Sequence, residues 1–167
     1  MLLTKEQFND VWDKIYDTFH FHPSVDTEVI PFVITEPHTV FDISSSDELT
    51  FGQYTHLITE AFIKCTTPGE QLLALEWQSS AFLFDPRKPQ QMESIYVADS
   101  RYFGGGYLAE FPPYYPDGDY YFFIDTHFRF GYLSHPWRKE VWIFGESLIG
   151  KFESIYKQLR WTVKEGL

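Results

Sequence analysis

Apolar residues recur every three or four positions in three stretches of the chain, which is the spacing of one face of an α-helix. The first stretch follows Thr4, and Gln7 completes a capping-box pattern there. The second stretch follows several candidate N-cap residues, Ser44-Ser45-Ser46-Asp47. The pattern predicts an N-terminal helix over residues 5–19, a central helix that ends near Lys64, and a C-terminal helix with apolar positions from Leu148 to Leu159.

Shorter β-prone runs lie between these helices. Residues 30–34 and 39–43 predict two short strands or an extended irregular segment. Pro31 and Pro37 favour a position at the edge of a sheet, because proline cannot donate a ladder hydrogen bond. Further strands are predicted at residues 72–77 and 81–84, as a hairpin or one bent strand, and at 120–124, 128–133 and 139–144, as an antiparallel meander.

The register of the meander depends on the length of its first loop. A loop formed by residues 126–128 sets Asp125 opposite Arg129, whereas a shorter loop sets Arg129 against Ile124. Cross-strand charge pairing favours the first arrangement. It predicts a core face of Tyr120, Phe122, Ile124, Phe130 and Tyr132, and a second face of Asp119, Tyr121, Phe123, Asp125, Arg129 and Leu133.

The fold class that follows is α+β, with an antiparallel meander sheet packed by an N-terminal, a central and a C-terminal amphipathic helix. The chain contains no internal repeat, low-complexity tract or linker, so we expect residues 1–167 to form a single domain. Residues 86–118 are rich in Gly, Pro and aromatic residues and are expected to form a long loop, which either lines a pocket or wraps the core.

Charge and composition narrow the classes of partner. The formal net charge is −11, which disfavours nucleic acid and anionic membrane surfaces as partners and suits a basic protein. Aromatic residues make up 20% of the chain, so some rings are expected at the surface. With Cys65 as the single cysteine, a polar N-terminus and no long apolar run, the sequence predicts a cytoplasmic protein without a membrane span.

The candidate chemistry is sparse, and no cofactor or metal is expected. His20 and His22 are spaced for a metal, but no partner residues complete a site. His135 in His135-Pro136-Trp137 is interpreted as a turn residue bonded to backbone, with a catalytic role as the alternative. Glu76, Asp119 and Asp125 are acids near aromatics, as in sites that cleave sugars.

Several short motifs together resemble a bacterial family designated domain of unknown function 2716. They are Glu76-Trp77-Gln78, Phe84-Asp85-Pro86, Pro116-Asp117-Gly118-Asp119-Tyr120-Tyr121, Gly131, His135-Pro136-Trp137 and Phe144-Gly145-Glu146, which span roughly the second half of the chain. The resemblance implies a single-domain bacterial cytoplasmic protein without an assigned activity, and it therefore supplies no catalytic residues.

Two hypotheses of function follow, and a third reading concerns self-association. The first is a protein-binding module without enzymatic activity, such as an immunity or antitoxin-like protein that binds a basic toxin. The alternative is a small-molecule-binding protein or hydrolase that uses an aromatic pocket with His135 and aspartates. In the third reading, the surface aromatics serve a homodimer. The candidate binding residues are Asp119, Tyr121, Asp125, Arg129, His135 and Trp137.

Overall fold

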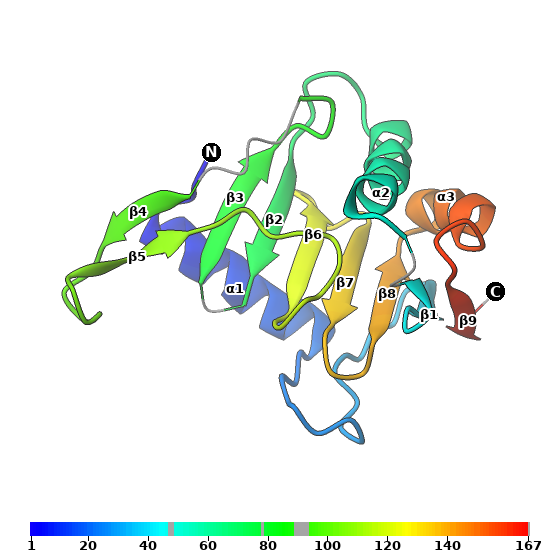
Figure 1. Ribbon diagram of the computed structural model, residues 1–167, viewed down its shortest axis with the longest axis horizontal. Helices are drawn as coiled ribbons and strands as arrows, with labels where there is room; N and C mark the ends of the chain where they lie inside the picture. Colours follow the sequence, from blue (N-terminus) through cyan, green and yellow to red (C-terminus); the bar gives the residue numbers. More distant parts are fainter. Residues whose placement is uncertain (47–48, 78, 89–93, 167) are drawn as a thin grey trace.

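The computed structural model describes residues 1–46, 49–77, 79–88 and 94–166, and its centre is a seven-stranded sheet (Figure 1). The strand order is β3-β2-β6-β7-β8-β1-β9, and every neighbouring pair is antiparallel. The strands are β1 (His38–Asp42), β2 (Leu72–Glu76), β3 (Ser80–Phe84), β6 (Tyr121–Asp125), β7 (Gly131–His135), β8 (Glu140–Phe144) and β9 (Thr162–Glu165). With three helices on this sheet, the predicted α+β class is confirmed.

Helix α1 (Lys5–Phe19) covers one face of the sheet, and Figure 1 shows it crossing behind the strands. Its start is the predicted capping box, in which Thr4 and Gln7 each bond the other's backbone amide. Trp12 packs 5.6 Å from the ring of Phe122, so the apolar stripe of the helix meets the central strands. The segment 20–37 covers the rest of this face and contributes Phe21 and Phe32 to the same core.

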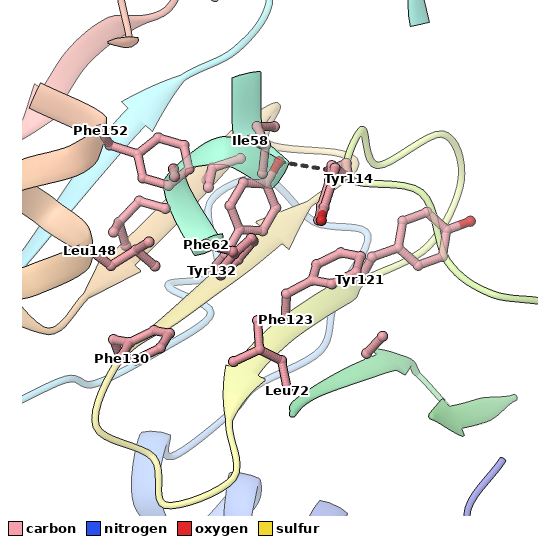
Figure 2. Packing of buried hydrophobic residues seen from close by; sticks show 14 of the residues in the cluster. Ile58, Phe62, Leu72, Tyr114, Tyr121, Phe123, Phe130, Tyr132, Leu148 and Phe152 are labelled. Carbon is pink, nitrogen blue, oxygen red and sulfur yellow. Dashed lines mark hydrogen bonds between the residues drawn. The ribbon is translucent and has the colours of Figure 1, made fainter. Parts of the chain in front are cut away.

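Helices α2 (Phe51–Cys65) and α3 (Glu146–Ile155) cover the opposite face. Figure 2 shows the core beneath them, where rings from the helices interdigitate with Phe123 and Tyr132 of the central strands. The N-cap prediction for α2 was wrong: Thr50 caps the helix and forms a second capping box with Gln53. Ser46 instead bonds the carbonyl of Ile43, and Asp47 lies outside the described residues.

The register predicted for the β6–β7 hairpin was wrong by one residue. Ile124 pairs with Gly131, and the amide of Asp125 donates to the carbonyl of Phe130, so residues 126–129 form the loop. The attraction between Asp125 and Arg129 is real, but it is made within the loop, at 2.7 Å, rather than between strands. The predicted faces change accordingly: Tyr120, Phe122 and Ile124 share the α1 core with Leu133, while Tyr121 and Phe123 share the α2 core with Phe130 and Tyr132.

The ends of the sheet also differ from expectation. Residues 30–34 are irregular, which is one of the two predicted alternatives, but β1 lies between β8 and β9 rather than at an edge. Pro31 and Pro37 remain compatible with the sheet because both lie outside the strands. The edge strand β9 was not predicted, since its four residues are all exposed and carry no buried apolar position. The choice between a hairpin and one bent strand is resolved as the β2–β3 hairpin.

Part of the predicted loop at residues 86–118 is a second sheet. Strands β4 (Ile95–Ala98) and β5 (Gly106–Ala109) form a hairpin that extends from the side of the main sheet (Figure 1). The glycines at 104–106 lie at its turn, and Gly104 and Gly105 have positive φ angles that suit glycine. The remaining residues, 110–120, return the chain across the end of α2 to the start of β6.

Among the described residues, the longest helices fall well short of the length and apolar character that a membrane crossing requires.

Candidate functional site

A groove of about 340 Å³ opens where the first turns of α2, the end of β2 and the 110–117 segment meet. Helix α2 contributes Phe51, Thr55 and Thr59, whose spacing of four residues places them on one helix face. The sheet contributes Glu76 and Tyr121, which are direct partners in the β2–β6 ladder. The opposite wall is formed by residues 110–114 and Asp117.

The aromatic wall of the groove is fixed from behind. The hydroxyl of Tyr132 donates to the carbonyl oxygen of Tyr114 at 2.7 Å, the contact drawn in Figure 2. The hydroxyl of Thr59 lies 3.3 Å from that of Tyr114, whose ring stacks on Phe62 at 5.8 Å between centroids. Burial raises the pKa of Tyr114 to about 12, so this hydroxyl stays neutral. The wall is thus held in place before any ligand arrives.

Acidic side chains converge at the floor of the groove. The pKa of Glu76 is raised to about 7. Burial is the largest cause, and the negative charges of Asp119, Glu110 and Asp117 add to it. Burial also raises the pKa of Asp119, whose carboxylate accepts a 2.7 Å hydrogen bond from the amide of Tyr120. Every charged group that shifts the Glu76 pKa is a carboxylate. The floor therefore concentrates negative charge in a partly dehydrated place.

The carboxylate of Asp117 is oriented by Tyr121. The Tyr121 hydroxyl donates to Asp117 Oδ1 at 2.7 Å, across the mouth of the groove. In the residues that the structure describes, no three His, Cys, Asp or Glu side chains are grouped closely enough to hold a metal ion. The acids nevertheless lie close enough for their negative charges to raise the pKa of Glu76.

Of the six predicted site residues, the structure brings Tyr121 and Asp119 to this groove. Tyr121 lines it, and Asp119 acts on Glu76 electrostatically. Asp125 and Arg129 lie at the opposite end of β6, in the β6–β7 turn. The idea of a sugar-cleaving pair therefore retains Glu76 and Asp119 but loses Asp125, which is 2% exposed and bound to Arg129.

His135 is a buried structural residue. The amide of Arg138 donates to His135 Nδ1 at 3.2 Å, which leaves the proton on Nε2, 3.1 Å from the Tyr120 hydroxyl. That hydroxyl donates to the carbonyl of Ser24 and accepts from its amide, both at 2.7 Å. Burial lowers the pKa of His135 to about 4, although the negative charge of Glu140 acts to raise it. His135 thus lies at the end of β7 rather than in the turn itself, and its ring nitrogens contact the backbone amide of Arg138 and the side chain of Tyr120.

Trp137 lies beside this network rather than in the groove. Its ring packs edge-on against Tyr120 at 5.5 Å and remains 38% exposed. His135 and Trp137 therefore belong together, as predicted, but on the α1 side of the sheet with Tyr120.

Sequence reasoning missed most of the groove. Asp117 was noted only as part of a family motif, and Phe51, Tyr114 and Glu110 were not singled out. One signal was present in the sequence: Phe51, Thr55 and Thr59 repeat every four residues on the side of α2 beside its core stripe. No sequence pattern indicated that Glu76 pairs with Tyr121, because this pairing arises only when β2 and β6 lie next to each other in the sheet.

Comparison with known proteins agrees with the motifs noted in the sequence. The profile described as protein of unknown function (DUF2716) matches residues 2–149, so the match extends well into the first half of the chain. The protein named Uncharacterized protein YxiI of Bacillus subtilis (strain 168) is 28% identical over 158 residues, covering 88% of each chain. No solved structure matches significantly. The chain therefore belongs to the DUF2716 family of proteins of unknown function.

Proposed function

We propose that this protein is a cytoplasmic, non-enzymatic module that binds a basic protein partner, in the manner of an immunity or antitoxin-like protein. The observation that carries the proposal is the groove floor, where every charged neighbour that shifts the Glu76 pKa is another carboxylate. Such a group of acids costs free energy in the unbound protein, because like charges repel in a partly dehydrated site. A cationic partner removes that cost on binding.

The walls of the groove support the same proposal. Aromatic residues are enriched in protein interfaces and often anchor the contact. Phe51 at the rim is 57% exposed, and Phe111 and Tyr114 line the interior. The net charge of −11 adds a long-range attraction that raises the rate of encounter with a basic protein.

A small-molecule-binding or hydrolytic function is the second candidate, favoured by the Glu76 pKa of about 7. A carboxyl group whose pKa is raised to about 7, beside a second carboxyl group, is a pairing that glycoside hydrolases use. In this candidate His135 takes no part, because its ring is buried and both nitrogens are bonded. Turnover of a saccharide substrate that Glu76→Gln abolishes would establish it and would displace the binding proposal.

Site-specific photo-cross-linking in the native host tests the proposal. A photoreactive phenylalanine is placed at Phe51 on the groove rim, and the matched control is placed at Val163, 38% exposed on β9. We expect a discrete adduct with a protein of net positive charge from position 51, and none from position 163. Equal adducts from both positions, or an acidic partner, would refute the proposal.

A further inference from the structure

The size and shape of the groove restrict what it receives. Its volume of about 340 Å³ lies at the small end of the range for ligand sites. Its long wall consists of two flat aromatic rings, Phe111 and Tyr114, and of the prolines between them, Pro112 and Pro113. Because Tyr114 is fixed through its carbonyl by Tyr132, this wall does not need to reorganise around an occupant. Such a space suits a single inserted side chain that has flat faces.

The charges restrict the occupant further. Glu76 lies at the floor, while Asp117 and Glu110 lie at the mouth and are exposed. Both the floor and the mouth therefore attract a cation. A flexible lysine presents a strongly hydrated point charge, whereas an arginine guanidinium is planar, more weakly hydrated, stacks on aromatic rings and bonds carboxylates in pairs. An aromatic wall over a carboxylate floor therefore suits arginine better than lysine, in shape, in hydration and in its bonds to carboxylates.

We infer that the groove is the receptor for one arginine side chain of the basic partner, with Glu76 and Asp117 as acceptors and Phe111 and Tyr114 as the stacking wall. This inference rests on the proposed function and specifies the chemistry of its contact. Since part of the Glu76 population carries a proton near neutral pH, binding of the guanidinium displaces that proton. Arginine binding is therefore coupled to proton release and strengthens as the pH rises from 6 to 8.

Titration with N-acetyl-arginine amide, followed by NMR, tests the inference without knowledge of the partner. The methyl groups of Thr55 and Thr59 report on the groove because both residues line it. N-acetyl-lysine amide tests the preference for a flat cation, and N-acetyl-citrulline amide has nearly the shape of arginine without the charge. We expect saturable shifts at both methyl groups, about threefold weaker binding of lysine and about tenfold weaker binding of citrulline.

Two variants complete the experiment. Glu76→Gln should weaken arginine binding about tenfold and remove its dependence on pH, whereas Glu153→Gln, on an exposed site of α3, should leave both unchanged. The inference would be overturned if the citrulline amide bound as tightly as the arginine amide. It would also be overturned if Glu76→Gln left the affinity for the arginine amide unchanged. The cross-linking result is separate: a basic partner captured from position 51 without an arginine preference leaves the proposed function standing and removes only the arginine contact.

Discussion

Burial shifts the pKa of two residues near the same end of the sheet, with opposite consequences. His135 has its pKa lowered to about 4 and sits in a closed network with Tyr120 and Ser24. Glu76 has its pKa raised to about 7 and faces other carboxylates across an open groove. The histidine is thus satisfied by hydrogen bonds within the fold, whereas the carboxyl group of Glu76 is surrounded by like charges.

Glu76→Gln is expected to stabilise the protein at high pH. Because the folded-state pKa of Glu76 is raised to about 7, the folded protein binds the proton more tightly, and stability falls as the pH rises from about 4.5 to 7. After discounting for partial exposure, the gain in the free energy of unfolding at pH 8 is about 1–2 kcal/mol. Urea unfolding at pH 4 and pH 8 measures it, and at pH 4 the two proteins should be equal.

The control for this prediction is Glu153→Gln, which removes the same charge from an exposed position on α3. It should change the stability by less than about 0.5 kcal/mol at either pH. If Glu76→Gln is destabilising at pH 8, the glutamate is compensated by a cation in solution and the groove is not a site of unrelieved repulsion.

Asp125→Ala is expected to destabilise the protein by about 2–3 kcal/mol at neutral pH. Although burial opposes its ionisation, the bonds from Arg129 hold the pKa of Asp125 below its usual value. Its carboxylate also accepts the amides of His127 and Arg129, so it fixes the β6–β7 turn. Because the pKa of Asp125 is lowered in the folded protein, its ionised form stabilises the fold at pH values above the unfolded-state pKa. This contribution is lost when the pH falls through the folded-state pKa.

The pH dependence of the Asp125→Ala effect separates this account from simple loss of volume. The stability difference between wild type and variant should shrink as the pH falls from 6 to 2, because the aspartate becomes protonated and its contribution disappears. A difference that stays constant over this range would show that the charge of Asp125 does not support the turn.

At the scale of elements, α1 and the end of α2 were predicted well because their signals are local, whereas α3 ends at Ile155 and not at Leu159 as its apolar stripe predicts. The Thr4–Gln7 box and the apolar stripe behind it specify α1 within a few residues, and both of its ends were correct. For α2, the same kind of box at Thr50 was overlooked in favour of the serines at 44–46. The β6–β7 register failed for a different reason: Asp125 and Arg129 attract each other equally well across strands or within a turn, and sequence alone does not distinguish these geometries.

The side chain of Tyr120 helps to hold the segment 20–37 in place. The hydroxyl of Tyr120 bonds both the amide and the carbonyl of Ser24, and it also contacts His135. Tyr120→Phe leaves these groups without their partner in a buried place, which costs about 1–3 kcal/mol. We expect amide exchange in residues 20–34 to accelerate at least about tenfold, while exchange in α2 is unchanged.

Tyr102→Phe provides the matched comparison, since Tyr102 is 43% exposed in the β4–β5 turn region. It should leave exchange in residues 20–34 as in wild type. Equal acceleration in both variants, or uniform acceleration throughout the sheet after Tyr120→Phe, would mean that the hydroxyl does not hold this segment specifically.

At the scale of the whole molecule, the groove exists because three distant parts of the chain meet. The start of α2, the end of β2 and the 110–117 segment converge at one end of the sheet, on the face that α2 and α3 cover. This meeting could not be predicted, because β2 pairs with β6 across 45 to 53 positions of sequence and the region between them lacks strong periodicity. The acidic and aromatic character of the site was foreseeable from composition, but its location was not.

Charge on this protein is therefore expected to act locally as well as globally. With a net charge of −11, any loss of negative charge weakens long-range attraction to a basic partner, mainly through the association rate and only modestly in affinity. Loss of negative charge at the groove also removes direct contacts with the partner. It should therefore act mainly by raising the dissociation rate.

The most direct test of the account is the dissociation constant of the basic protein cross-linked from position 51, measured against two double variants of equal charge. Glu110→Lys with Asp117→Lys changes the groove, and Asp13→Lys with Glu153→Lys makes the same change on exposed sites of α1 and α3. The account predicts that the groove variant weakens binding about 100-fold or more and the matched variant less than about fivefold. Equal weakening by the two variants would contradict it.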